Sequence, residues 1–261
     1  MTPIYTLATK FYKTFYEKKW PGDLAPAVSK LSLAEAYQVQ DQVTKMRIDR
    51  GETVIGFKVG CTSQAIRTQF GLQAPISGRL FSPYIYEAGV QLDWRNYVNC
   101  AIEPEMVIRM SQDITNEDPS DAQLISAIAY VSPGIELHNF RFWFSPPTSQ
   151  ELICSGGILA GLVIGSQKVA PSVLTFTTGI FRVYKDEVLI TEGPASEIMG
   201  GPLHSLRWLV NALIQRGTYL KKGSLVIPGS PIELVRITQD THLKVEISDV
   251  GHLTTVFKSR S

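Results

Sequence analysis

The chain contains 261 residues, with 25 lysines and arginines against 24 aspartates and glutamates, and its formal net charge at pH 7 is +1. A charge this close to zero produces no field that would hold a polyanion, so we do not expect nucleic acid as a partner. Hydrophobic residues make up 44% and charged residues 19% of the chain. This composition is typical of a globular protein and excludes a largely disordered one.

The sequence predicts no membrane segment. Its longest nearly uncharged run, Leu152 to Gly165, is shorter than the roughly 20 residues that span a bilayer, and its glycines and β-branched residues favour a buried strand. The first residues lack a basic stretch followed by an apolar one, so we predict no signal peptide. The three cysteines, Cys61, Cys100 and Cys154, have no metal-ligand spacing and indicate free buried thiols, which are typical of a cytoplasmic protein.

The N-terminal part of the chain is predicted to be helical. Pro3 occupies a position where proline is common, at the start of a helix that should end before Gly22. A second helix has a clearer beginning, because Ser32 and Glu35 fit a capping box, and Gly51 follows its last apolar positions. Neither helix carries residues that suggest chemistry, so we expect both to pack against the protein or a partner.

From residue 53 onward, short apolar runs predict strands. They lie at 53–60, 101–110, 134–138, 158–165, 180–184, 225–227, 233–237 and 242–247. Two further helices interrupt them, one capped by Ser120 and one that begins at Pro202. Because strands outnumber helices without regular alternation, we predict a mixed, strand-dominated α+β fold. The chain would divide into a helical part, 1–52, and a β-rich catalytic domain, 53–261, or form one domain overall.

The most informative segment runs from Cys100 to Ile108 and contains Glu103 and Glu105. Side chains on a strand alternate between its two faces, so both glutamates project to one side and the apolar residues between them to the other. Two carboxylates about 4 Å apart, at an effective dielectric constant near 20, repel each other by about 4 kcal/mol. A shared proton, a basic side chain or a divalent cation must therefore neutralise the pair.

Glu136 is a third candidate carboxylate. It lies in an apolar segment, Pro133 to His138, where a glutamate costs free energy unless it is paired or bound to a metal. Together, Glu103, Glu105 and Glu136 would suit a hard ion such as Mg²⁺ or Mn²⁺ better than zinc. The alternative from spacing alone is that all three lie on solvated strand faces or form salt bridges.

Lys58 is the basic residue with the most distinctive surroundings. It occupies one face of a predicted strand between Gly56 and Gly60, which would leave room for a ligand to approach the backbone. A partly buried ammonium beside carboxylates can donate a proton or hold a carboxylate. The alternative is a lysine on an edge strand, where its charge opposes aggregation.

Other candidate residues are weaker. The histidines are scattered, and the most interesting is His138, which shares a strand face with Glu136. We interpret it as a residue behind the ligands or at the surface. The segment 228–231 is a turn by composition, and its backbone or the Ser230 hydroxyl is a candidate ligand-binding group.

Taken in order, several segments resemble the fumarylacetoacetate hydrolase superfamily, in its branch of hydratases and decarboxylases that act on 2-oxo and 2-hydroxy dienoic acids. The resemblance extends from about Ser32 to Phe257. The matching segments are 56–63 for Gly-x-Lys-x-Gly-x-Thr-Ser, 103–105 for Glu-x-Glu, Glu136 for a later single glutamate, 200–209 for a Gly-x-Pro helix start, and 228–231 for a Thr-Gly-Thr-Pro turn. None of these segments alone is specific to the family, but their order along the chain and the separations between them are.

The resemblance implies a fold, a metal and a class of substrate. The family fold is a mixed β-roll with a helical N-terminal part, and homo-oligomers are usual in the family. It also implies a divalent ion, Mg²⁺ or Mn²⁺, held by Glu103, Glu105 and Glu136. Such an ion would chelate the 1-carboxylate and 2-oxo oxygen of a small 2-oxo acid and stabilise the enolate oxygen that develops during the reaction.

The resemblance assigns further roles and also shows departures. Lys58 would handle a proton or orient the substrate, and Ser230 with Gly229 would help to hold a carboxylate. Ile76 stands where hydratases commonly have an aspartate, in a pattern closer to the Pro-Ile-x-Gly of oxalocrotonate decarboxylases. Ser155 stands near a usual aspartate, so the groups that would select the reaction are altered.

We therefore predict a divalent-metal-dependent lyase on a small 2-oxo or 2-hydroxy dienoic acid, similar to 2-keto-4-pentenoate hydratase. One alternative is a 4-oxalocrotonate-type decarboxylase. Another is an acylpyruvate-type C–C hydrolase, with His138 or His204 as the base that activates water. A third is a non-catalytic homologue that binds 2-oxo acids.

Overall fold

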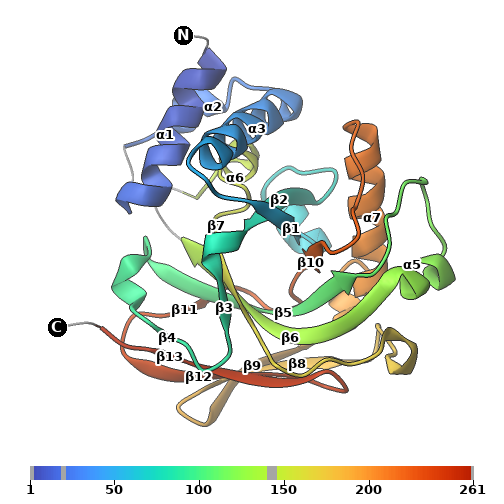
Figure 1. The fold of residues 1–261 in the computed structure, drawn as a ribbon. Helices are drawn as coiled ribbons and strands as arrows, with labels where there is room; N and C mark the ends of the chain where they lie inside the picture. Colours follow the sequence, from blue (N-terminus) through green and yellow to red (C-terminus); the bar gives the residue numbers. More distant parts are fainter. Residues whose placement is uncertain (1–2, 19–21, 140–145, 260–261) are drawn as a thin grey trace.

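The computed structural model describes residues 3–18, 22–139 and 146–259, and it contains two β-sheets with helices around them (Figure 1). The helices are α1 (Pro3–Glu17), α2 (Ala25–Val28), α3 (Leu33–Asp49), α4 (Gln64–Gln69), α5 (Asp121–Ala127), α6 (Ser149–Cys154) and α7 (Pro202–Gln215). The strands are β1 (Val54–Gly60), β2 (Ile76–Phe81), β3 (Ile85–Glu87), β4 (Gln91–Leu92), β5 (Cys100–Met110), β6 (Ile128–Asn139), β7 (Leu159–Ile164), β8 (Ile180–Lys185), β9 (Val188–Pro194), β10 (Leu225–Ile227), β11 (Val235–Arg236), β12 (Thr241–Ile247) and β13 (Gly251–Phe257).

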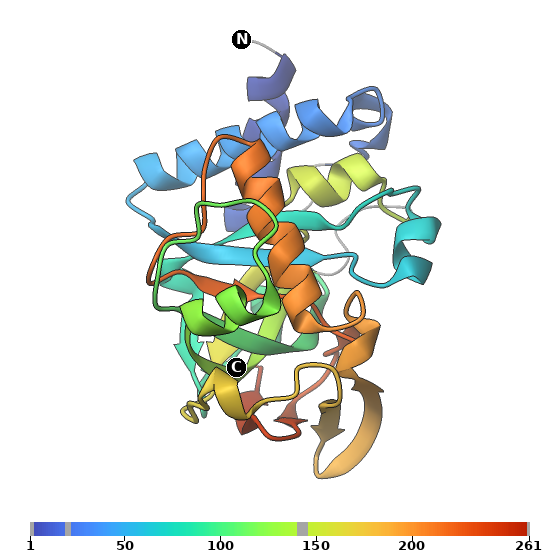
Figure 2. The same cartoon turned by 90° about the vertical axis from the view of Figure 1, so that its right-hand side faces the viewer.

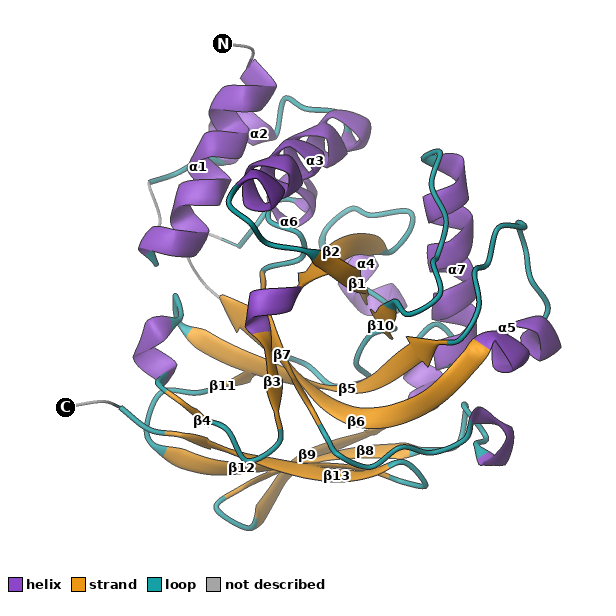
Figure 3. Cartoon of the chain, in the orientation of Figure 1, coloured by secondary structure: helices purple, strands orange, loops and turns teal. Residues whose placement is uncertain are grey.

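The larger sheet has eight strands and curls into a roll. Its order is β2-β1-β10-β5-β6-β7-β3, and β11 pairs with β5 outside this path. In Figure 3 the strands of this sheet curve so that they enclose one face. The long strands β5 and β6 are antiparallel neighbours near the middle of the sheet. Residues on the inner face of β5 and β6 therefore lie opposite the strands at the two ends of the roll.

The second sheet covers the outer face of β5 and β6. It has five strands in the order β4-β13-β12-β8-β9. Ile102 and Met106 of β5 belong to the same buried cluster as Val183 of β8 and Val245 of β12. The next residue, Val107, belongs instead to a cluster on the inner face with strands β2, β7 and β10. The predicted alternation of the 100–108 segment between two faces is thus confirmed.

Helices α1, α3 and α6 pack together over one end of the roll, and α7 lies along the side that faces the viewer in Figure 2. Leu7 of α1, Val39 of α3 and Ile153 of α6 share a second buried cluster with Ile76 of β2. The predicted capping box at the start of α3 is present. Among the described residues, none of the helices combines the length and the apolar character needed to cross a bilayer.

The predicted α+β class is confirmed, and so are the helices at α1, α3, α5 and α7. The strand predicted at 158–165 is confirmed as β7, whereas the first part of the nearly uncharged run from Leu152 forms the end of a helix, α6, that was not predicted. This run contains the end of α6 and then β7, because Gly156 and Gly157 both adopt positive φ angles and turn the chain between them. Strands β2, β3, β4, β9 and β13 were not predicted. The division at residues 52 and 53 stays a prediction.

Gly56 marks the closest approach of β1 to β10. A Cβ atom at this position would lie 1.9 Å from the carbonyl oxygen of Leu225, and the backbone cannot move away without breaking the pairing of these strands. We expect Gly56→Ala to lower the free energy of unfolding by about 3 kcal/mol or more. Chemical denaturation followed by circular dichroism measures this change.

The matched control is Gly179→Ala, where the nearest atom to the new Cβ would be 3.6 Å away, an ordinary van der Waals distance. We expect a change within about 0.5 kcal/mol for this variant. Equal, small changes in both variants would contradict the close approach of β1 and β10.

Candidate metal centre

The candidate centre lies on the inner face of the roll, where β5 pairs with β6. Glu103 and Glu136 are directly opposite each other in the register of the two strands, and Glu105 lies two residues further along β5. Glu105 and Glu136 are both 0% exposed, and Glu103 is partly buried. The three predicted carboxylates are therefore brought to one face, and the alternative of solvated strand faces is wrong for Glu105 and Glu136.

Lys58 reaches the carboxylates from the opposite part of the roll. Its Nζ lies 2.7 Å from Glu136 Oε1 and donates a hydrogen bond to the carbonyl oxygen of Gly157 at 3.2 Å. The residue is 3% exposed. Because β1 lies between β2 and β10, Lys58 is not on an edge strand, and that alternative is wrong.

The glycines around Lys58 have a different role from the one predicted. Gly56 leaves no room for a ligand, because the backbone of Leu225 fills the space next to it. A Cβ atom on Gly157 would lie 3.1 Å from Lys58 Nζ. A Cβ atom on Gly60 would lie 3.5 Å from the same nitrogen. These last two glycines therefore make space for the lysine side chain itself.

Glu105 is held by the turn that follows β10. Its Oε2 accepts a hydrogen bond from the backbone N–H of Gly229 at 3.1 Å. This N–H was predicted to help hold a substrate carboxylate, and in this structure it holds a protein carboxylate instead. Ser230 Oγ accepts a hydrogen bond from the backbone N–H of Ile232 at 3.1 Å, and the predicted role of Ser230 toward a ligand stays a prediction.

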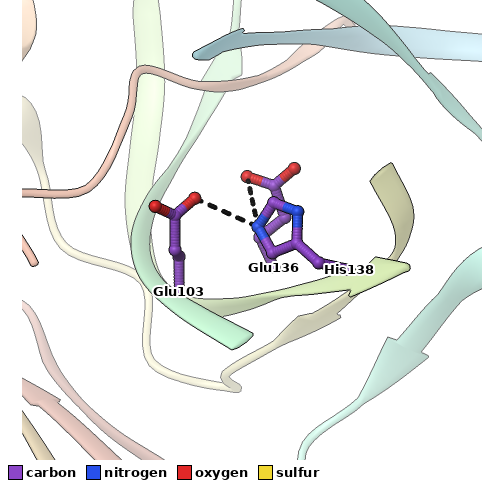
Figure 4. A group of neighbouring side chains, drawn as sticks. All are labelled: Glu103, Glu136 and His138. Carbon is purple, nitrogen blue, oxygen red and sulfur yellow. Dashed lines mark hydrogen bonds and ion pairs between the residues drawn. The ribbon is translucent and has the colours of Figure 1, made fainter. Parts of the chain in front are cut away.

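His138 is the residue whose place in the site was underestimated from the sequence. It is 1% exposed, so a surface role is wrong. Its Nε2 lies 3.0 Å from Glu103 Oε2 and 3.6 Å from Glu136 Oε2 (Figure 4). The ligating atoms of Glu103, Glu136 and His138 all lie within 4.8 Å of one another, whereas Glu105 is outside this group.

The charges of these groups perturb one another strongly. Burial would lower the pKa of Lys58, but the negative charges of Glu136 and Glu103 raise it above its ordinary value. Burial would raise the pKa of Glu103, but the hydrogen bond and charge of His138 and the charge of Lys58 lower it. Burial, together with the charges of Glu136 and Glu103, raises the pKa of Glu105 well above its usual range.

These side chains fit a divalent cation. Lys58 supplies the basic partner that one carboxylate needs, but a single ammonium cannot neutralise three buried carboxylates. Within the described residues, Glu105 Oε1 and Glu136 Oε2 are buried without a hydrogen-bond partner. Unpartnered buried carboxylate oxygens are costly and are the donors that divalent ions take. Glu103, Glu105 and Glu136 as the ligand set stays a prediction.

The two altered positions do not face this group. Ile76 is 2% exposed and packs in the cluster beneath the N-terminal helices. Ser155 Oγ donates a hydrogen bond to the carbonyl oxygen of Leu152 and accepts one from the N–H of Ile158. Both hydrogen bonds stabilise the C-terminal end of α6. His204 is exposed, and its Nδ1 lies 3.1 Å from the carbonyl oxygen of Met199. Neither residue nor His204 supplies a polar group to the carboxylates.

Cys61 is a neighbour of the site that the spacing of cysteines did not reveal. The charges of Lys58 and Glu103 both act on its thiol. Burial raises the pKa of Cys61 to about 11, with a smaller raising effect from Glu103, while Lys58 lowers it. The thiol is therefore protonated at neutral pH, and we assign it no nucleophilic role.

No protein-family model matches the chain. Over 222 residues the chain is 27% identical to a 2-keto-4-pentenoate hydratase of Burkholderia vietnamiensis, covering 85% of both chains. Over 228 residues it is 28% identical to a 4-oxalocrotonate decarboxylase of a Pseudomonas species, covering 86% of both. These relatives match most of the chain, so the resemblance is not confined to the short motifs.

Solved structures share the fold. The 4-oxalocrotonate decarboxylase from Pseudomonas putida G7, complexed with magnesium and adipate, superimposes with a TM-score of 0.92 at 21% identity and covers 97% of both chains. Fumarylpyruvate hydrolase from Pseudomonas aeruginosa, in complex with Mn²⁺ and pyruvate, gives a TM-score of 0.62 at 14% identity, covering 78% of this chain and 89% of that one. The predicted β-roll with a helical N-terminal part is confirmed, and over most of its length this chain is similar to proteins named 2-keto-4-pentenoate hydratase and 4-oxalocrotonate decarboxylase.

Proposed function

We propose that this chain is a divalent-metal-dependent lyase that acts on a small 2-oxo or 2-hydroxy dienoic acid, in the manner of 2-keto-4-pentenoate hydratase. The observation that carries the proposal is the buried group on β5 and β6, where Glu103 and Glu136 face each other beside Lys58. The sequence relatives named as hydratases and decarboxylases support the same class of reaction.

Glu103, Glu105 and Glu136 are the proposed ligands of the ion, which we take to be Mg²⁺ or Mn²⁺. When bound, the ion would supply a Lewis acid that holds the 1-carboxylate and 2-oxo oxygen of the substrate and stabilises negative charge on that oxygen. Three carboxylates are donors that both ions accept. Solved structures with this fold in complex with magnesium or with Mn²⁺ support this choice.

Lys58 is the proposed proton-transfer group. It is the buried ammonium beside the carboxylates, and their negative charges keep it protonated at neutral pH. The inner face of the roll beyond it is apolar, with Val107, Leu162 and Ile227 in one buried cluster. These three side chains are 0% exposed, so they exclude water from this part of the roll and help to keep Lys58 away from solvent.

Decarboxylation is the second candidate reaction, and the scarcity of acid–base groups favours it. Ile76 and Ser155 leave the site without the carboxyl groups expected of a hydratase. Loss of CO₂ from a 2-oxo acid needs an electron sink and one proton donor, whereas addition of water also needs a base. The C–C hydrolase alternative needs such a base as well; exposed His204 is outside the group of carboxylates, whereas His138 lies within it.

The remaining expectations rest on the family resemblance. We propose a homo-oligomer in the cytoplasm that takes a small-molecule 2-oxo acid as its substrate. The exposed side chains of Val188, Leu189 and Ile190 on β9, at the edge of the smaller sheet, are compatible with a subunit contact.

The reaction class is tested by incubating the protein with 2-hydroxypentadienoate or oxalocrotonate and Mg²⁺. We expect loss of the dienoate absorbance, with the product distinguished by mass spectrometry as a hydrated acid or by release of CO₂. Addition of EDTA should abolish turnover, and Mg²⁺ should restore it. Tight binding of oxalate or pyruvate without turnover of either substrate would contradict the lyase and identify a binding protein.

Glu136→Gln tests the metal centre directly. The change removes the charge that faces both Lys58 and Glu103 while it keeps the shape of the side chain. We expect Mg²⁺ affinity to fall by more than the ~10–100-fold that loss of a residue supporting a metal ligand costs. Isothermal titration calorimetry measures the dissociation constant. The control is Glu192→Gln on β9, whose carboxylate pairs with Arg182 in solvent, and unchanged affinity in both variants would refute the site.

Lys58→Met separates the lysine's charge from its packing. Removing the ammonium leaves the carboxylate of Glu136 buried and uncompensated, so we expect the metal-free protein to lose about 3–5 kcal/mol of stability. Saturating Mg²⁺ should return part of this loss, while turnover stays abolished. Urea denaturation with and without Mg²⁺ measures the effect, with Lys244→Met, whose partner Glu246 is at the surface, as control. Retained turnover would refute the proton-transfer role.

A further inference from the structure

His138 lies beside the proposed carboxylate ligands, and a metal centre of three carboxylates gives it no role. The side chain is 1% exposed, and it stands on the inner face of the roll two residues beyond Glu136. The ring reaches across to β5, where its Nε2 approaches Glu103 (Figure 4). A buried imidazole between two carboxylates is a group that the lyase reaction proposed above does not use.

We propose that His138 is a further ligand of the ion and joins Glu103 and Glu136 through Nε2. The inference rests on the metal centre of the proposed function and changes its donor set from oxygen alone to oxygen with one imidazole nitrogen. The consequence is selectivity: the centre would favour transition ions such as Mn²⁺ and Co²⁺ over Mg²⁺, because imidazole suits these ions and Mg²⁺ prefers oxygen.

The spacing of the donor atoms supports the proposal. Nε2 of His138 lies 3.0 Å from Glu103 Oε2 and 3.6 Å from Glu136 Oε2. Donors about 2.1 Å from one ion are about 3.0 Å apart when they are at right angles and about 3.4 Å apart at a tetrahedral angle. Two of the three donor pairs thus already have a spacing close to that of ligands on one ion, and the three donor atoms lie within 4.8 Å of one another.

Burial supplies a second, independent observation. Within the described residues, Oε2 of Glu136 has no hydrogen-bond partner although the side chain is 0% exposed, and it is the oxygen that faces His138. Glu105 does not compete for this position, because its Oε2 is held by the N–H of Gly229. A carboxylate oxygen left unpartnered beside a buried imidazole is an arrangement that a shared cation would satisfy.

A structural role for His138 makes a different prediction. If the imidazole only positions Glu103 through a hydrogen bond, its loss should weaken all divalent ions by the same factor. Glutamine at this position would then restore binding, because its amide can also donate to the carboxylate. If His138 is a ligand, the loss should fall on Mn²⁺ and Co²⁺, and glutamine should not restore their affinity.

The experiment uses the full chain stripped of metal with a chelator and titrated with Mg²⁺, Mn²⁺ and Co²⁺ by calorimetry. The variants are His138→Gln and His138→Leu, with His242→Gln as the matched control because His242 is exposed on β12. We expect both His138 variants to weaken Co²⁺ and Mn²⁺ about tenfold or more and Mg²⁺ by far less. Circular dichroism of each apo variant verifies folding, and His138→Gln keeps the test valid if His138→Leu does not fold.

A spectroscopic measurement reports the bond itself. Electron spin echo modulation of the Mn²⁺-loaded protein should show coupling to an imidazole nitrogen, and this coupling should be absent in His138→Gln. No nitrogen coupling in the unaltered protein, or equal weakening of all three ions, would overturn the inference and leave His138 as a positioning residue while the metal centre stands. Failure of the unaltered protein to bind any of the ions would overturn the metal centre as well.

Discussion

The excess of buried negative charge where β5 meets β6 is the constraint on which the rest of the site depends. Glu103 and Glu136 are direct neighbours across two antiparallel strands, a placement in which like charges destabilise a sheet. Glu105 adds a third carboxylate in the same buried surroundings, and the rise in its pKa shows how unfavourable a further negative charge is there. Lys58 offsets only part of this cost. A divalent cation would offset the remaining cost, and a proton on Glu105 would offset part of it when no cation is bound.

The two sheets divide the work of building this site. The five-stranded sheet covers the outer face of β5, so that Ile102 and Met106 bury apolar surface there and hold the strand in register. The roll brings β1 to the far side, where Gly56 allows the backbone of β10 to approach within the distance that pairing needs. Only with β1 in that position can Lys58 extend across the interior to Glu136. Packing far from the carboxylates thus decides which charges meet.

The sequence predicted what local patterns determine. Period-two alternation placed Glu103 and Glu105 on one face of a strand, and capping residues located the start of α3, because both signals depend on neighbours along the chain. Local patterns did not predict which residues on neighbouring strands lie opposite each other. The contact of His138 with Glu103 follows from the register of β5 and β6, which no short segment encodes. The turn at Gly156 and the short helix α6 were missed for a related reason, since the apolar composition of that run also fits a strand.

The positions that depart from the family pattern are explained by where they lie. Ile76 packs in the core beneath the N-terminal helices, and the hydroxyl of Ser155 donates a hydrogen bond to a carbonyl oxygen at the end of α6. Both residues therefore stabilise the structure without reaching the carboxylates. Among the described residues, Lys58 and His138 are the buried basic groups beside the glutamates, so the proton transfer that we propose would use one or both of them. If His138 binds the ion through its imidazole, Lys58 is the basic group that remains to transfer a proton. A site with an electron sink and one proton donor is suited to losing CO₂ more than to adding water, so the role of His138 and the choice of reaction are one question.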